Sequence, residues 1–178
     1  MENLHKKKFI ISFLVIMAIV IIILCKFLSW HETRISEIDI SGIQNITAEE
    51  GYLLCLDSNY YIRSEYADTS LNIRGWSVIK DQPTNAVAIF VLLRDTGTDK
   101  VYKLPTIVEM RQDVTTHVNS LYGTDINYDY SGFYAKTACG DYFDFDNNTY
   151  EMGMLYKING ASYVFFTGRN IALEGGSN

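Results

Sequence analysis

Residues 150–166, YEMGMLYKINGASYVFF, carry the clearest indication of β-structure in the chain. They place two runs rich in β-branched and aromatic residues, 151–158 and 161–166, on either side of Asn159-Gly160. A type I′ turn needs positive φ at both of its central residues, and Asn-Gly meets that requirement well. The stretch therefore predicts an antiparallel β-hairpin.

Further runs of the same kind lie along the chain on the N-terminal side of this hairpin. They span residues 35–40, 51–62, 71–80, 86–94, 100–104 and 142–145. The run at 86–94 is apolar on both faces, as a central strand would be. A polar loop containing Gly97 leads into the run at 100–104, and Asn147-Asn148 follows the run at 142–145. Both loops favour hairpins.

Residues 112–123 have a different period. Val114, Val118 and Leu121 recur at helical spacing before Gly123, which predicts a short helix or an irregular crossover. The other runs amount to about nine strands, with turn residues about every 8–12 positions. In a domain of this size they predict an all-β fold, an antiparallel β-sandwich of the jelly-roll or Ig-like type.

The N-terminal segment predicts one transmembrane helix ahead of this domain. Residues 9–25 carry no charge, and three lysines at 6–8 precede them. A bilayer core of about 30 Å takes about 20 apolar residues in a helix, so residues 9–30 are long enough to span it. The lysines predict a cytoplasmic N-terminus and an extracellular domain at the cell membrane. A cleaved or lipidated signal is the alternative, although residues 24–30 lack a small-residue cleavage site and Leu24 does not fit a lipobox.

These patterns divide the chain into five parts. They are a basic cytoplasmic tail (1–8), a transmembrane signal anchor (9–30), a juxtamembrane segment (31–50), an extracytoplasmic sandwich (51–172) and a flexible tail (173–178). After Trp30 the chain has 11 Lys and Arg against 20 Asp and Glu, a formal charge of −9. This acidity argues against nucleic acid and polyanionic wall polymers as direct ligands, and it leaves neutral glycans, cationic groups and proteins.

The histidine and cysteine residues give no sign of catalysis. Nucleophilic catalysis needs a nucleophile, a base and a group that orients the base. His117 is the one histidine inside the expected domain, and we expect it on the surface. Cys55 and Cys139 show no framework spacing, which favours two thiols over one disulfide. We therefore expect a protein that is not an enzyme and has no cofactor.

A carboxylate-rich segment at residues 141–148 has two further interpretations. Asp144, Asp146 and Asn148 are oxygen donors at alternate positions, as in a calcium loop. The Gly and Glu that an EF-hand needs at its sixth and twelfth positions are absent, so we expect no metal site. Because paired carboxylates can cleave glycosidic bonds, the alternative function is a carbohydrate-active hydrolase or transferase that uses Asp141, Asp144 and Asp146.

Aromatic residues are the remaining candidates for binding. Sugar-binding proteins present aromatic faces to pyranose rings, and tyrosine adds a hydroxyl group. Four aromatic residues in β-rich runs are expected in the core: Trp76, Phe90, Phe133 and Phe165. The candidate ligand-binding residues are tyrosines in or near polar loops, which we expect to be exposed, and one charged pair: Tyr60, Tyr61, Tyr66, Tyr128, Tyr130, Arg111 and Asp113.

An ordered set of short motifs resembles a module of bacterial cell-envelope proteins. The motifs are Leu71-Asn-Ile-Arg-Gly-Trp76, the run at 87–93, Lys100-Val-Tyr102, Arg111-Gln-Asp-Val114, Ser131-Gly-Phe133 and the run at 150–156. This module accompanies multi-spanning glycosyltransferases and other surface-polysaccharide proteins. The resemblance covers residues 51–172 and implies a non-catalytic β-sandwich. The chain departs from such proteins in having one expected membrane helix and no glycosyltransferase body.

Arg111 and Asp113 lie two positions apart and fall on one side of an extended segment. We expect them to fix a corner through charge-assisted hydrogen bonds to nearby backbone, with ligand binding as the alternative.

Together, the patterns predict a membrane-anchored, non-catalytic binding or accessory protein of bacterial cell-envelope or surface-polysaccharide assembly. Its expected partners are the lipid bilayer, through the N-terminal helix, and either an envelope glycan or a membrane-bound glycosyltransferase. A structural subunit of a surface complex is a further alternative.

Overall fold

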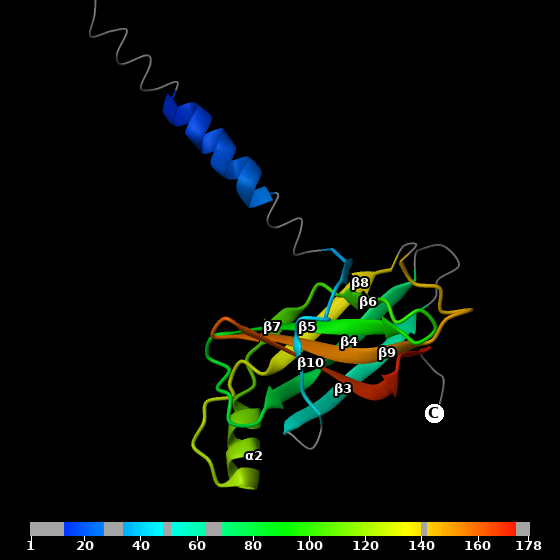
Figure 1. The fold of residues 1–178 in the computed structure, drawn as a ribbon. Helices are drawn as coiled ribbons and strands as arrows, with labels where there is room; N and C mark the ends of the chain where they lie inside the picture. Colours follow the sequence, from blue (N-terminus) through cyan, green and yellow to red (C-terminus); the bar gives the residue numbers. More distant parts are fainter. Residues whose placement is uncertain (1–12, 27–33, 48–50, 63–68, 140–141, 174–178) are drawn as a thin grey trace, which may run out of the picture. The chain divides into compact units, whose positions relative to one another are not determined.

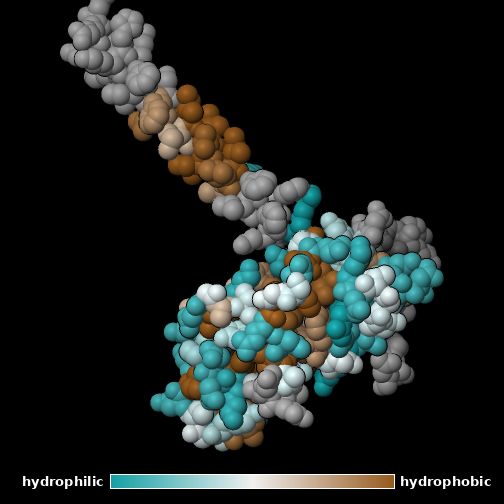
Figure 2. All heavy atoms as spheres, viewed as in Figure 1, coloured by the Kyte–Doolittle hydropathy of each residue, from teal (hydrophilic) through white to brown (hydrophobic). Residues whose placement is uncertain are grey.

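A computed structural model describes residues 13–26, 34–47, 51–62, 69–139 and 142–173. The expected cytoplasmic tail, both ends of the expected anchor and nearly all of the expected C-terminal tail lie outside these residues. The chain forms two compact units, Met1–Arg34 and Ile35–Asn178. In the first unit, residues 13–26 form a helix with exposed side chains, most of them apolar (Figure 2). None of the helices in the described part of the chain has the length and hydrophobicity of a membrane span.

The second unit is mostly β-structure arranged in two sheets (Figure 1). The six-stranded sheet runs in the order β1 (Ser36–Ile38), β6 (Val101–Lys103), β5 (Val87–Asp95), β9 (Tyr150–Ile158), β10 (Ala161–Asn170), β2 (Gln44–Asn45). The five-stranded sheet runs in the order β11 (Ala172–Leu173), β3 (Tyr52–Ile62), β4 (Ser70–Ile79), β8 (Gly132–Ala138), β7 (Ile107–Glu109). Neighbouring strands are antiparallel except for β10 with β2 and β11 with β3.

The mostly β content and the predominance of antiparallel pairing are confirmed. There are more strands than the nine expected, because edge strands such as β2 and β11 have only two residues each and carry no readable period. The juxtamembrane segment of the sequence prediction contributes both β1 and β2 to the six-stranded sheet.

The hairpin predicted around Asn159-Gly160 is confirmed. Ile158 pairs with Ala161 across the turn, and φ is 51° at Asn159 and 83° at Gly160. The run at 86–94 is also confirmed as an inner strand, since β5 lies between β6 and β9.

The hairpin predicted around Asn147-Asn148 is wrong. Residues 142–149 are turns and irregular backbone, all of them described, and no strand precedes the turn. The Asp144 carboxylate accepts hydrogen bonds from the backbone N–H groups of Asp146 and Asn147, at 3.1 and 3.2 Å. Such local bonds offer the backbone an alternative to a β-ladder. The same segment turns the ring of Phe143 into the core, where it is 7% exposed.

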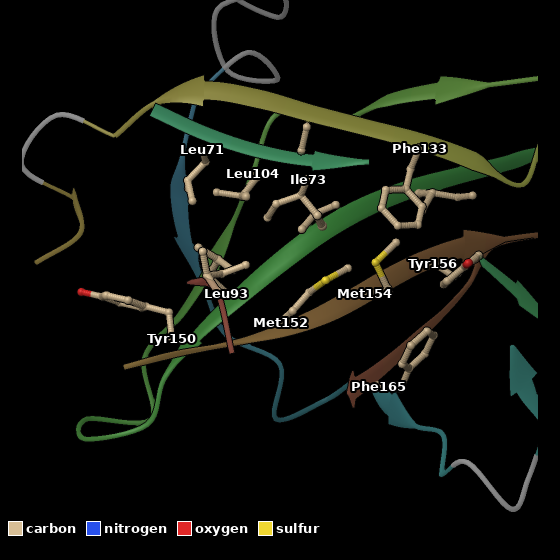
Figure 3. Packing of buried hydrophobic residues seen from close by; sticks show 14 of the residues in the cluster. Leu71, Ile73, Leu93, Leu104, Phe133, Tyr150, Met152, Met154, Tyr156 and Phe165 are labelled. Atoms are coloured by element: carbon tan, nitrogen blue, oxygen red, sulfur yellow. The ribbon is translucent and has the colours of Figure 1, made fainter. Parts of the chain in front are cut away.

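The main core lies between the two sheets (Figure 3). The five-stranded sheet contributes Leu71, Ile73 and Phe133, and the six-stranded sheet contributes Leu93, Met152, Met154, Tyr156 and Phe165. These side chains interdigitate from the two inner faces, and most of them are fully buried.

Two of the four aromatic residues expected in the core are there. Phe133 and Phe165 are each 0% exposed, which confirms their prediction. Trp76 and Phe90 are only half-buried, so their prediction is wrong. Both lie on the outer faces of their sheets: Trp76 packs beside a small cluster under a helix, and Phe90 lies beneath the ammonium groups of two lysines.

The helix predicted at 112–123 is confirmed as α2 (Gln112–Tyr122). It covers one end of the outer face of the five-stranded sheet, where Val114 and Val118 are buried against Val78 and Tyr128. It ends at Gly123, whose N–H donates to the Asn119 carbonyl at 2.8 Å. Among the described residues, the other side chains on that outer face are half-buried or exposed, and this sets the position of the candidate site.

Candidate functional site

The exposed part of the outer face of the five-stranded sheet brings polar and aromatic side chains together. We call it the polar face and define it by Ser58, Tyr60, Asn72, Arg74, Trp76 and Tyr134. Leu71 and Ile73 point into the core, so the alternate residues of β4 point outward. The strand register places Arg74 between Ser58 and Tyr134, and Asn72 beside Tyr60. One surface therefore combines three half-buried aromatic rings with hydrogen-bonding groups.

Hydrogen bonds along the sheet hold these side chains in place. The side-chain amide of Asn72 donates from Nδ2 to the Tyr60 hydroxyl at 2.8 Å and accepts at Oδ1 from the Ser58 hydroxyl at 3.2 Å. Arg74 binds the Glu109 carboxylate through Nε and Nη2, at 2.9 and 3.1 Å, and its guanidinium lies 5.7 Å from the centre of the Tyr134 ring. The bonds to Glu109 raise the pKa of Arg74. A surface ordered in this way loses little side-chain entropy when it binds a ligand.

Arg111 forms a charged corner between α2 and β3. Its Nη2 lies 2.9 Å from Asp113 Oδ2, and its Nη1 lies 3.2 Å from Asp57 Oδ2. The backbone N–H of Arg111 donates to the Asp129 carbonyl at 2.6 Å. The side chain thus joins two carboxylates rather than the backbone groups that we expected. The hydrogen bonds from Arg111 lower the pKa of Asp113, which stays ionised over the neutral range.

A hollow of about 240 Å³ opens between α2 and the polar face. It is lined by Trp76 from β4 and by Asp113, Val114 and His117 from α2. The centres of the Trp76 and His117 rings are 6.1 Å apart, with the rings inclined at 70°. His117 is exposed, as expected. The hollow offers an aromatic wall, a carboxylate that can accept hydrogen bonds and an imidazole.

The structure places only some of the predicted site residues at this surface. Tyr60 lies on the polar face, and Arg111 and Asp113 lie at its corner. Tyr61 lies on the opposite side of β3, packs against the main core and stacks on Phe145 with ring centres 4.2 Å apart. Tyr66 lies outside the described residues.

Two more of the predicted tyrosines lie elsewhere. Tyr128 is 1% exposed, so its prediction as an exposed loop residue is wrong. It is buried in the cluster under α2, where its hydroxyl accepts from the Asp81 N–H at 3.3 Å, and burial raises its pKa. Tyr130 is exposed, at 42%, but it is not part of the polar face.

Several residues of this surface were missed by the sequence analysis. The sequence patterns predict a core position for Trp76 and no role for Asn72, Arg74 or Tyr134. The sequence does indicate that Asn72 and Arg74 share an outer face, because these polar residues alternate with apolar Leu71 and Ile73 along β4. Asp57 had no signal, since it lies 54 positions before Arg111 and meets it only in the fold.

The carboxylate-rich segment is separate from the polar face. Asp144 and Asp146 are exposed, and Asp141 lies outside the described residues. Within the part of the chain that the structure describes, no group of three or more His, Cys, Asp or Glu side chains could hold a metal ion. Cys55 is exposed and Cys139 is buried, and no disulfide joins these two described residues.

The chain thus contains a mostly β domain of two sheets, one of which has an ordered, partly aromatic outer face. Comparison of the chain with family models, with curated proteins and with solved structures finds no match. We therefore infer the function from the geometry of the polar face, its corner and the hollow beside α2.

Arg111→Ala is expected to lower the free energy of unfolding more than Asp113→Ala. Arg111 contacts two carboxylates, whereas Asp113 is 66% exposed, and exposed ion pairs contribute about 0.2–1 kcal/mol each. Because the two residues share one network, the double variant should cost less than the sum of the single variants. Urea unfolding of the four proteins measures this coupling.

The coupling should also depend on pH. The pKa of Asp113 is lower in the folded protein, so its contribution is complete above the ordinary aspartate pKa and disappears as the pH falls through the folded value. Strict additivity at neutral pH, or coupling that survives strong acid, would contradict this description of the corner.

Proposed function

We propose that this chain is a membrane-anchored, non-catalytic protein that binds a glycan of the bacterial cell envelope on its polar face, in the course of surface-polysaccharide assembly. The observation that carries the proposal is the combination of half-buried Trp76, Tyr60 and Tyr134 with ordered polar groups on one open sheet face. Aromatic rings pack against the C–H faces of pyranose rings, and amide, guanidinium and carboxylate groups bond the hydroxyl groups around them.

The charge of the domain supports a neutral or cationic glycan. The residues after Trp30 carry a formal charge of −9. At the corner, Arg111 is balanced by Asp57 and Asp113, and on the polar face Arg74 is balanced by Glu109. Arg74 and Arg111 therefore offer an anionic polymer no uncompensated charge, although exposed Lys136 lies beside Asn72 on the same sheet face, and hydroxyl groups would find both donors and acceptors.

The proposal includes a β-sandwich of the jelly-roll or Ig-like type, anchored by a transmembrane helix with the N-terminus in the cytoplasm. A core between two facing sheets supports the first part. The apolar run at 9–25 and the exposed apolar side chains of residues 13–26 support the second, because a helix that is apolar all round needs an apolar environment. A mature N-terminus between Cys25 and Glu32, found by sequencing the membrane-extracted protein, would exclude the anchor.

Trp76→Ala is expected to weaken glycan binding at least tenfold, which corresponds to about 1.4 kcal/mol. The full-length protein in nanodiscs would be screened on an array of bacterial glycans, and the affinity of the best neutral ligand would be measured by calorimetry. Phe90→Ala is the matched control, because Phe90 is a half-buried aromatic residue on the outer face of the other sheet. Its affinity should equal that of the parent protein.

Three outcomes would overturn the proposed function. The first is a parent protein that binds none of the glycans, and the second is an equal loss of affinity in Trp76→Ala and Phe90→Ala. The third is release of product from peptidoglycan, acetylated glycans or chromogenic glycosides that Asp144→Asn and Asp146→Asn abolish, since this would establish the enzymatic alternative.

A further inference from the structure

A second recessed site lies on the other sheet, where β10 departs from regular pairing. The β9–β10 register shifts between Phe166 and Asn170. Beside this irregularity is a pocket of about 410 Å³, which we call the bulge pocket; its walls include Asn45, Tyr52, Arg94, Glu151, Phe166 and Thr167. Irregularities of this kind re-aim side chains and are over-represented beside functional sites.

A partly buried ion pair, with Glu151 as its buried member, forms one wall of the bulge pocket. Arg94 and Glu151 are register partners on β5 and β9, on the face opposite the core residues Leu93 and Met152. Arg94 donates to Glu151 Oε2 from Nε at 3.0 Å and also from Nη2. Glu151 is 9% exposed, and its Oε1 accepts from the Gly168 N–H at 2.7 Å. Both oxygens of the carboxylate are therefore engaged.

Arg94 is held on two sides and open on a third. Its guanidinium carbon lies 4.2 Å from the centre of the Phe166 ring, which fixes the plane of the group. The bonds to Glu151 use one edge of the fork, but a guanidinium has five N–H donors. The side chain is 35% exposed and lines the pocket, so donors that Glu151 does not use are accessible from it.

The ion pair contributes little net stability, because desolvation of the buried Glu151 carboxylate offsets much of its attraction to Arg94. We infer instead that the Glu151 carboxylate holds the Arg94 guanidinium in one orientation. A ligand then meets donors that are already placed, which reduces the entropy lost on binding.

The chemistry of the pocket defines the class of ligand. The Arg94–Glu151 pair has no net charge, and the domain around it is strongly acidic, so an anion gains little there. Arg94 supplies donors, and the exposed amide of Asn45 supplies both donors and an acceptor. The Tyr52 hydroxyl donates to the Phe166 carbonyl at 3.4 Å, which leaves its oxygen able to accept.

We propose that the bulge pocket binds a single neutral sugar residue, independently of the polar face. Sugar hydroxyl groups can both accept from Arg94 and donate to the oxygens of Tyr52 and Asn45, and the rings of Tyr52 and Phe166 provide apolar walls. With one site on each sheet the domain is bivalent, and two sugars of one polymer bound together would give an avidity above either single affinity.

The test uses the full-length protein in nanodiscs and saturation-transfer NMR with methyl glycosides of glucose, galactose and mannose, N-acetylglucosamine and methyl glucuronide. At least one neutral sugar should bind. Asn45→Ala and Arg94→Lys should each weaken it at least tenfold, because a lysine side chain keeps the charge opposite Glu151 but has no second planar edge. Asn85→Ala, which removes another exposed amide, is the matched control and should change nothing.

A third variant, Trp76→Ala, separates this proposal from the proposed function. Binding that survives in Trp76→Ala and is lost in Asn45→Ala assigns the sugar to the bulge pocket, whatever the polar face does. Three results would overturn the inference: no binding of any neutral sugar, unchanged affinity in both Asn45→Ala and Arg94→Lys, or tighter binding of the glucuronide than of the neutral glycosides.

Discussion

Phe133→Ala is expected to lower the free energy of unfolding by about 3–5 kcal/mol, the usual cost of removing a large aromatic ring from a core. Phe133 is 0% exposed and lies between the sheets, where Figure 3 shows its ring on the side of β8 that faces Met154. The loss of stability has two parts: the favourable free energy of burying the ring, which is lost, and the cost of the cavity left between the two sheets. Urea unfolding followed by tryptophan fluorescence measures it.

The control for this prediction is Trp76→Ala. Trp76 is half-buried on the outer face, so its removal exposes less new apolar surface and leaves no closed cavity. It should cost clearly less stability than Phe133→Ala, although the side chain is larger; circular dichroism replaces fluorescence for this variant. Equal costs for the two variants, or an unchanged midpoint for Phe133→Ala, would contradict the assignment of the two faces.

Gly75→Ala is expected to cost about 3 kcal/mol, at the upper end of the range for overpacked sites. A Cβ at Gly75 would overlap the carbonyl oxygen of Cys55 and lie 3.1 Å from the Cα of Leu56. Both neighbours are backbone atoms of β3, so no change of rotamer can relieve the overlap. β3 and β4 would have to separate at the point where their register shifts, between Leu56 and Ser58.

Gly42→Ala is the matched control, because a Cβ at Gly42 would meet no atom within 4 Å. Thermal melts of the two variants under the same conditions make the comparison. Equal melting temperatures for Gly75→Ala and Gly42→Ala would contradict the close approach of β3 to β4. The predicted result would also explain why Gly75 precedes Trp76. A residue without a Cβ lets the backbone of β3 approach β4 at position 75, and the Trp76 side chain lies on the outer face.

Features with a local cause were predictable from the sequence. The turn at Asn159-Gly160 follows from the ability of these two residues to adopt positive φ. The helix at Gln112–Tyr122 follows from apolar side chains repeating at its period, with Gly123 as its end. Each of these signals is complete within a dozen residues, so no distant contact is needed to read it.

Features that depend on distant partners were not predictable. Residues 143–146 alternate apolar and polar side chains as a strand would, yet they form no strand, and the rings of Phe143 and Phe145 pack on Tyr102 and Tyr61 from distant parts of the chain. Tyr128 lies in a polar stretch and was expected outside, but α2 folds over it. The Arg111 corner needs Asp57 from β3, which no spacing near Arg111 indicates.

In β3 a register shift between Leu56 and Ser58 interrupts the alternation of side chains. For an unbroken strand such as β4, the sequence alone determined which residues share a face, because side chains alternate with a period of two whatever the strand packs against. It did not determine which face of β4 meets the main core, since Leu71 and Ile73 on one side and Trp76 and Val78 on the other are all apolar. The tertiary structure decided that: the six-stranded sheet covers the side of Leu71, and α2 covers only the Val78 end of the other. The part that α2 leaves uncovered is the polar face.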